Sequence, residues 1–132
     1  MPDDNDDQDA VFGDVIFRYT RKQAIEDGVL VDITETAKEA GIKYPVAITS
    51  TAFFGYVALD PMPPGQDLKG RLWDLVWMFS VAARRNSDST LLFQVLFVMP
   101  DSPEPREVTL KAVCGPGDDP APVITIMLIA ES

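Results

Sequence analysis

The chain has 132 residues, 46% of them hydrophobic and 24% charged, which suits one globular domain and is too short for two. It contains no histidine, and this excludes catalytic triads with an imidazole base and zinc sites with histidine ligands. Its 21 acidic and 11 basic residues give a formal net charge of −10, which argues against direct binding to nucleic acid or to an anionic membrane.

The first segment, residues 1–11, is acidic and has little to bury. Five aspartates and no basic residue lie in residues 1–9, so half of the net charge is concentrated there. We expect residues 1–11 to be a disordered tail and residues 12–132 to form a single domain. The tail is unlike a signal peptide, no segment is apolar enough to span a membrane, and a single cysteine cannot form an internal disulfide. We therefore expect a cytoplasmic protein.

Short elements are predicted in the N-terminal half of the chain. Three segments rich in β-branched or apolar residues are expected to be extended: residues 15–19, 29–33 and 43–47. Three others are expected to be helical: residues 21–27, 35–40 and 50–59. Thr20 and Thr34 are placed to cap the first two helices, and Gly28 and Gly41 are placed to end them in a left-handed conformation.

The strongest helical pattern follows a proline-rich loop and covers residues 67–85. Its apolar residues recur at spacings of three and four: Leu68, Leu72, Leu75, Val76, Phe79, Ala82 and Ala83. Trp73 and Trp77 lie four residues apart and widen this stripe on one flank. We expect such a helix to be buried over most of its circumference, inside the domain or against a second subunit.

Three strands are predicted in the C-terminal third. Residues 91–99 are almost continuously apolar, as is typical of a strand covered on both faces. Residues 107–114 alternate in polarity, and residues 122–130 are again apolar. The short connectors favour a three-stranded antiparallel meander, to which residues 15–19 could add a fourth strand. The predicted fold class is α+β, with the long helix on one face of a three- to four-stranded sheet.

Residues 115–120 form the most distinctive short motif, with Asp118 and Asp119 between glycines and prolines. We interpret it as a hairpin turn whose glycines supply positive φ, and the alternative is a loop that presents both aspartates to a metal ion or a basic partner. Cys114 lacks a histidine that could activate its thiol and is interpreted as a small inward-facing residue. Asp74 is expected on an exposed strip of the long helix, or else paired with a nearby arginine.

Trp73 and Trp77 are interpreted as anchors of the core or of an interface. The alternative, a platform for a base or a sugar, is disfavoured by the acidic surroundings. The basic cluster of Arg18, Arg21 and Lys22 is too small to bind nucleic acid and is interpreted as the solvated start of a helix. No motif predicts a catalytic residue, a metal ion or a cofactor.

Residues 12–41, 70–78 and 108–128 together resemble a bacterial family of uncharacterised small proteins that are often carried on plasmids, phages and other mobile elements. The resemblance covers nearly all of the chain after the acidic tail. It implies a single-domain accessory protein of mobile DNA, and it provides no catalytic residues.

These observations support a non-enzymatic protein that binds a protein partner, which would be basic if the acidic surface makes the contact. One version imitates the charge of DNA and blocks a restriction or CRISPR-type nuclease. The alternative is a small carboxylate-based enzyme or ligand-binding domain, with or without a divalent metal, near Asp118, Asp119 or Asp74. A third hypothesis is a homodimer sealed by the helix that carries Trp73 and Trp77, or by the exposed face of the meander.

Overall fold

One mixed β-sheet of five strands organises the protein, and its strand order is β1-β2-β5-β4-β3. The computed structural model describes residues 19–131. The strands are β1 (Leu30–Asp32), β2 (Val46–Thr49), β3 (Thr90–Met99), β4 (Ser102–Pro116) and β5 (Pro122–Leu128). The acidic tail and nearly all of the strand predicted over residues 15–19 lie outside the described residues, and Tyr19 is not in a strand.

The three C-terminal strands pair antiparallel in chain order, as their short connectors predict. They do not form a sheet of their own, because β5 also pairs in parallel with β2, and β2 pairs antiparallel with β1. The prediction of an α+β fold with a long helix is confirmed, but the predicted three- to four-stranded sheet is wrong. The parallel contact joins segments more than seventy residues apart, and no local pattern announces such a pairing.

The helices are α2 (Arg21–Glu26), α3 (Thr34–Glu39), α4 (Ser50–Ala52), the π-helix η1 (Phe53–Val57) and α5 (Leu68–Arg85). Thr20 caps α2 as predicted: its hydroxyl accepts from the Gln23 amide, while the Gln23 side chain accepts from the Thr20 amide. Thr34 does not cap α3, because it is the first residue of the helix. Its hydroxyl oxygen instead accepts from the Val46 amide at 3.1 Å and so ties α3 to β2.

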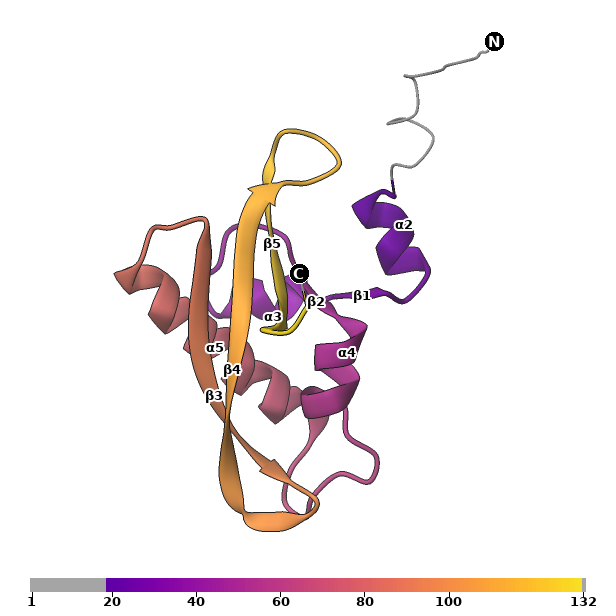
Figure 1. Cartoon of the computed structure of the whole chain (residues 1–132), viewed down its shortest axis with the longest axis vertical. Coiled ribbons are helices and arrows are strands. Elements are labelled where there is room, and N and C mark those ends of the chain that lie inside the picture. The colour runs from indigo at the N-terminus through magenta and orange to yellow at the C-terminus, as the bar shows by residue number, and fades with distance from the viewer. Residues whose placement is uncertain (1–18, 132) are drawn as a thin grey trace.

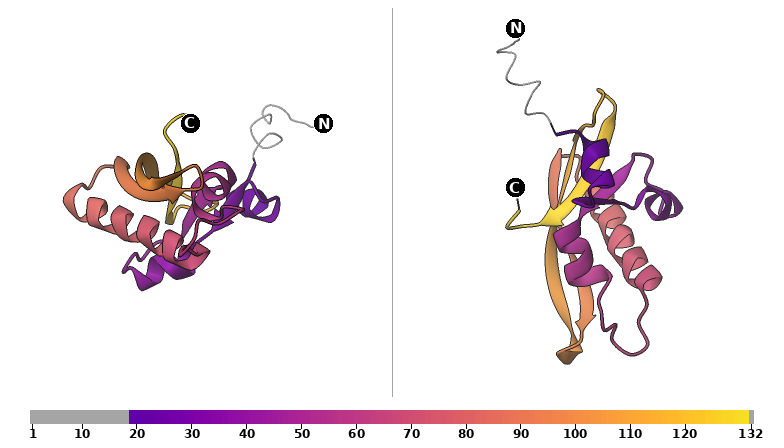
Figure 2. Two further views of the ribbon diagram at one scale, coloured as in Figure 1. Left: turned by 90° about the horizontal axis from the view of Figure 1, so that it is seen from below. Right: turned by 90° about the vertical axis from the view of Figure 1, so that its right-hand side faces the viewer.

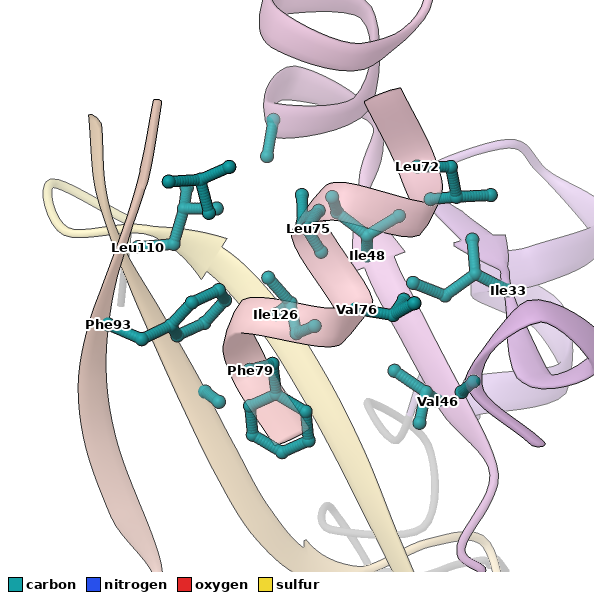
Figure 3. Close-up of a cluster of buried hydrophobic side chains, with 14 of the residues drawn as sticks. Ile33, Val46, Ile48, Leu72, Leu75, Val76, Phe79, Phe93, Leu110 and Ile126 are labelled. Carbon is teal, nitrogen blue, oxygen red and sulfur yellow. The ribbon is translucent and has the colours of Figure 1, made fainter. Parts of the chain in front are cut away.

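The hydrophobic core lies between the sheet and the helices α3 and α5, which cover the same face of the sheet (Figures 1 and 2). Figure 3 shows the inward side chains of α5 pointing at the strands: Leu72, Leu75, Val76 and Phe79. They meet a layer contributed by four strands: Val46, Ile48, Phe93, Leu110 and Ile126. Within residues 19–131, no helix is both long and apolar enough to cross a membrane.

The predictions of burial for α5 and for β3 are both wrong. The helix α5 is not buried over most of its circumference, because Leu68, Trp73, Trp77 and Met78 are exposed. The strand β3 is not covered on both faces, because its residues alternate between buried and exposed along most of its length. In both elements the sequence is rich in apolar residues, but the fold covers only one side of the element.

Candidate interaction site

The two tryptophans of the chain lie together on one flank of α5, since residues four apart share a helix face. The rings of Trp73 and Trp77 stack with centroids 6.0 Å apart and planes inclined by 20°. Their exposed fractions are 36% and 41%, and neither residue belongs to the buried core. The guanidinium carbon of Arg84 lies 5.5 Å from the centre of the Trp77 ring. We call Trp73, Trp77 and Arg84 the tryptophan surface.

Two open depressions lie between α5 and the segment formed by α3 and the residues after it. The first, of about 530 Å³, contains one of the two tryptophans and is lined by Thr36, Glu39, Asp67, Lys69, Gly70 and Trp73. The second, of about 280 Å³, contains the arginine of the tryptophan surface and is lined by Ala40, Gly41, Ile42, Lys43, Tyr44, Phe79, Ser80, Ala83, Arg84 and Ile124. Both depressions therefore border the tryptophan surface.

The charges around the tryptophan surface are mixed. Glu39 and Asp67 are acidic, while Lys69 and Arg84 are basic. One oxygen of Asp67 is already used as the N-cap of α5, where it accepts from the Gly70 amide at 2.7 Å. Exposed stacked rings with a nearby guanidinium and two depressions are suited to receive apolar side chains within a polar rim.

Asp118 lies apart from the tryptophans, in the loop between β4 and β5 (Figure 1). Its two carboxylate oxygens accept from the backbone amides of Arg21 at 2.7 Å and Lys22 at 3.0 Å, so the loop caps the start of α2. Asp119 accepts from the amide of Ala121 at 2.9 Å, which closes a local turn. Both contacts stabilise the fold.

A loop does join β4 to β5, but it begins after Pro116, so residues 115 and 116 of the predicted turn belong to β4. The predicted cause, positive φ at the loop glycines, is also wrong. Among residues 19–131, positive φ values occur at Gly28, Gly41 and Gly65, and not at the two loop glycines. Gly117 is required for a different reason: an added Cβ would lie 2.9 Å from a methyl carbon of Val123. The glycine thus permits a close approach of the two strand ends.

We expect Asp118→Ala to lower the free energy of unfolding by about 1–2 kcal/mol, because two amides at the start of α2 lose their acceptor. Urea unfolding followed by circular dichroism measures this change. Asp88→Ala, a substitution of an exposed aspartate in the turn before β3, is the matched control and should change stability by less than about 0.5 kcal/mol. Equal stability of the two variants would contradict the capping role.

Arg21 is not the solvated residue that the sequence suggested. Its guanidinium donates to the Thr125 hydroxyl at 2.7 Å and to the Ile124 carbonyl at 2.7 Å, so it joins α2 to β5. Partial burial lowers the pKa of Arg21, and the nearby carboxylates of Asp32 and Asp118 partly oppose that shift. Arg18, the other arginine of that cluster, lies outside the described residues.

Arg71 is a buried charged residue whose role the sequence does not predict. It lies on the inner side of α5 with 1% of its surface exposed. Its Nε and Nη2 atoms donate to the Tyr56 carbonyl at 3.1 and 2.6 Å, and Nη1 donates to the Val98 carbonyl at 2.7 Å and to the Gln66 side chain at 3.1 Å. Burial lowers the pKa of Arg71, which the charge of Asp74 partly opposes. The available signal was its position, three residues after Leu68 and four before Leu75 on the apolar face.

The remaining candidates do not converge on one site. Asp74 is exposed on α5, as one of the two alternatives expected, and Cys114 is a free, partly buried residue packed against the core. Within residues 19–131, no group of three or more cysteine, aspartate or glutamate side chains is arranged to hold a metal ion. The structure therefore places Trp73 against Trp77 and Asp118 against the start of α2. The tryptophans and Asp118 do not form one site.

Fold and site together define a small α+β protein with an exposed aromatic surface on its long helix. A family described as a family of unknown function (DUF6573) matches residues 9–132, so the chain belongs to this family. This confirms the expected resemblance to an uncharacterised family. No curated protein and no solved structure matches the chain.

Proposed function

We propose that this protein is a non-enzymatic interaction module that binds a protein partner through the tryptophan surface. The observation that carries the proposal is the exposed stacking of Trp73 and Trp77 outside the core. Tryptophan and arginine are among the residues most enriched at energetic centres of protein interfaces, and tryptophan buries a large area with few rotatable bonds. The two depressions beside them offer places for partner side chains.

The biological setting that we propose is a cytoplasmic accessory protein of a plasmid, phage or other mobile element. The resemblance described above and the net charge of −10 support this setting. In this setting the partner would be a basic host defence protein, a restriction or CRISPR-type nuclease, that the acidic protein inhibits by electrostatic complementarity. The described acids do not all remain available for such a contact, because Asp67, Asp101 and Asp118 already hold local contacts.

The test of partner binding is a comparison of variants. Immobilised protein should retain one partner from host lysate, and Trp73→Ala/Trp77→Ala should lose it. Phe54→Ala removes a more exposed aromatic ring, from η1, and should retain the partner. Because Trp73 and Trp77 are the only tryptophans, the purified partner should also shift the intrinsic tryptophan emission of the chain. Equal retention by the double variant, or an unchanged emission, would contradict the proposal.

The proposed setting has its own assay. Phage plating or plasmid transformation in a host with an active defence system should rise when the protein is expressed. The increase should disappear with Trp73→Ala/Trp77→Ala and persist with Phe54→Ala. Equal plating with and without the protein would rule out inhibition of that defence system. Repeating the binding measurement at low and high salt then separates a charge-driven contact, which salt weakens, from an aromatic one.

A further inference from the structure

The strand β3 is the outermost strand of the sheet, and within residues 19–131 it pairs only with β4 (Figure 1). The Cys114 amide donates to the Ser89 carbonyl at 2.7 Å, which sets the alternation of the antiparallel ladder. The amides and carbonyls of Leu92, Gln94 and Leu96 consequently face away from β4, toward the open edge. The Val98 carbonyl faces the same way and is taken by Arg71, which closes the edge at that end.

This edge lacks the features that normally protect an edge strand. Natural sheets shorten their edges or place charges, prolines and bulges on them, because unpaired backbone groups attract another strand. The opposite edge, β1, has three residues and includes Asp32. In contrast, β3 has ten residues without a charge or a proline, and its register stays regular up to Val98. Leu92 and Leu96 are 55% and 62% exposed on its outer face.

We propose that β3 pairs antiparallel with β3 of a second copy of this chain, about a two-fold axis at Gln94. In this register Leu92 lies opposite Leu96 of the second copy, and Gln94 lies opposite itself. Each of these three residues would donate one backbone hydrogen bond and accept one, so the unpaired edge is satisfied from both sides. The exposed leucines would be buried against each other, which gives a continuous sheet through the dimer.

The charged residues beside β3 do not place like charges together in this register. On the outer face of β4, Lys111 is paired with Leu92, and Glu107 is paired with Leu96. The two-fold axis therefore aligns Lys111 and Leu92 of one copy with Leu96 and Glu107 of the other. These four side chains form a row across the dimer, with Lys111 at one end and Glu107 at the other, and the two-fold axis generates a second such row. Two acidic chains repel over most of their surfaces, and β3 lets them meet through a strand that carries no charge.

The first test measures the mass of the full chain by light scattering after size exclusion. We expect twice the mass of one chain, and we expect Leu92→Lys/Leu96→Lys to give a monomer whose circular dichroism is that of the native fold. Ile129→Lys places the same charge at an exposed aliphatic position after β5 and should leave the dimer intact. A monomeric wild-type chain, or a dimer that survives the double substitution, would overturn the proposal.

The second test fixes the register with cysteines in a Cys114→Ser background. Gln94→Cys should form a disulfide-linked dimer under mild oxidation, because directly opposite residues in such a pair lie about 5.5 Å apart between Cα atoms. Leu92→Cys and Leu96→Cys should each stay uncrosslinked alone and crosslink when mixed. Crosslinking of Leu92→Cys with itself in preference to Gln94→Cys would overturn the register. The tryptophan surface takes no part in this pairing, so either proposal can fail without the other.

Discussion

Replacing Arg71 with methionine is expected to lower the free energy of unfolding by about 3 kcal/mol. The methionine keeps an unbranched, flexible apolar stem but is shorter, and it lacks the guanidinium whose carbon lies 4.9 Å from the ring centre of Phe97. It leaves the carbonyls of Tyr56 and Val98 without their donor. Each such buried carbonyl costs about 1–3 kcal/mol, while removing a buried cation recovers part of that loss.

Urea unfolding at neutral pH measures the free energy of unfolding of each variant. An unchanged slope of the transition shows that the substitution has altered stability alone. Lys69→Met makes a similar change at an exposed site on the same helix and should alter stability by less than about 0.5 kcal/mol. Arg71→Lys keeps the charge but loses the planar fork that reaches two carbonyls at once, so its stability should lie between those of wild type and Arg71→Met. A methionine variant as stable as wild type would show that Arg71 does not tie these segments together.

Replacing Leu75 with alanine is expected to lower the free energy of unfolding by about 3 kcal/mol. Leu75 is fully buried on α5 and faces the strands of the sheet (Figure 3). The cost combines the lost transfer of the side chain from water and the cavity left among residues that cannot collapse into it. Because α5 covers the sheet through this row of side chains, the loss should appear in one cooperative transition.

Leu68→Ala is the matched control for Leu75→Ala, since both leucines belong to the apolar stripe of the same helix. Leu68 is 42% exposed and should cost less than about 1 kcal/mol. Thermal unfolding followed by circular dichroism separates the two variants. Similar melting temperatures would mean that the inner face of α5 has been placed wrongly, because the helical period alone does not distinguish these two positions.

The local elements of the fold could be predicted because their causes are local. Thr20 caps α2 through Gln23, three residues away, and Gly28 and Gly41 take the left-handed conformation just after α2 and α3. The period of α5 and the alternation of β4 follow from the polarity of neighbouring residues. Thr34 shows the limit of this reasoning: its hydroxyl bonds to β2, which a local rule for N-caps does not consider.

The candidate site could be predicted only in part. Trp73 and Trp77 were singled out from their spacing, but whether they lie in the core or on the surface depends on what packs against α5. The sheet covers the side of Leu75 and Val76, which leaves the tryptophan flank exposed. The role of Arg71 was missed because its acceptors are two backbone carbonyls in η1 and β3, and no side-chain pattern marks a carbonyl as unsatisfied.

By itself, the sequence determined the α+β class, the absence of histidine chemistry, the Thr20 cap of α2 and the period of α5. Tertiary structure decided that β2 pairs in parallel with β5, that one face of β3 is exposed, and that Asp118 caps α2. The physical reason is the range of the interactions: caps and periods depend on residues within about one helical turn. Strand partners and burial depend on which distant segments meet. Bringing such segments together costs chain entropy, and only the contacts of the complete core offset that cost.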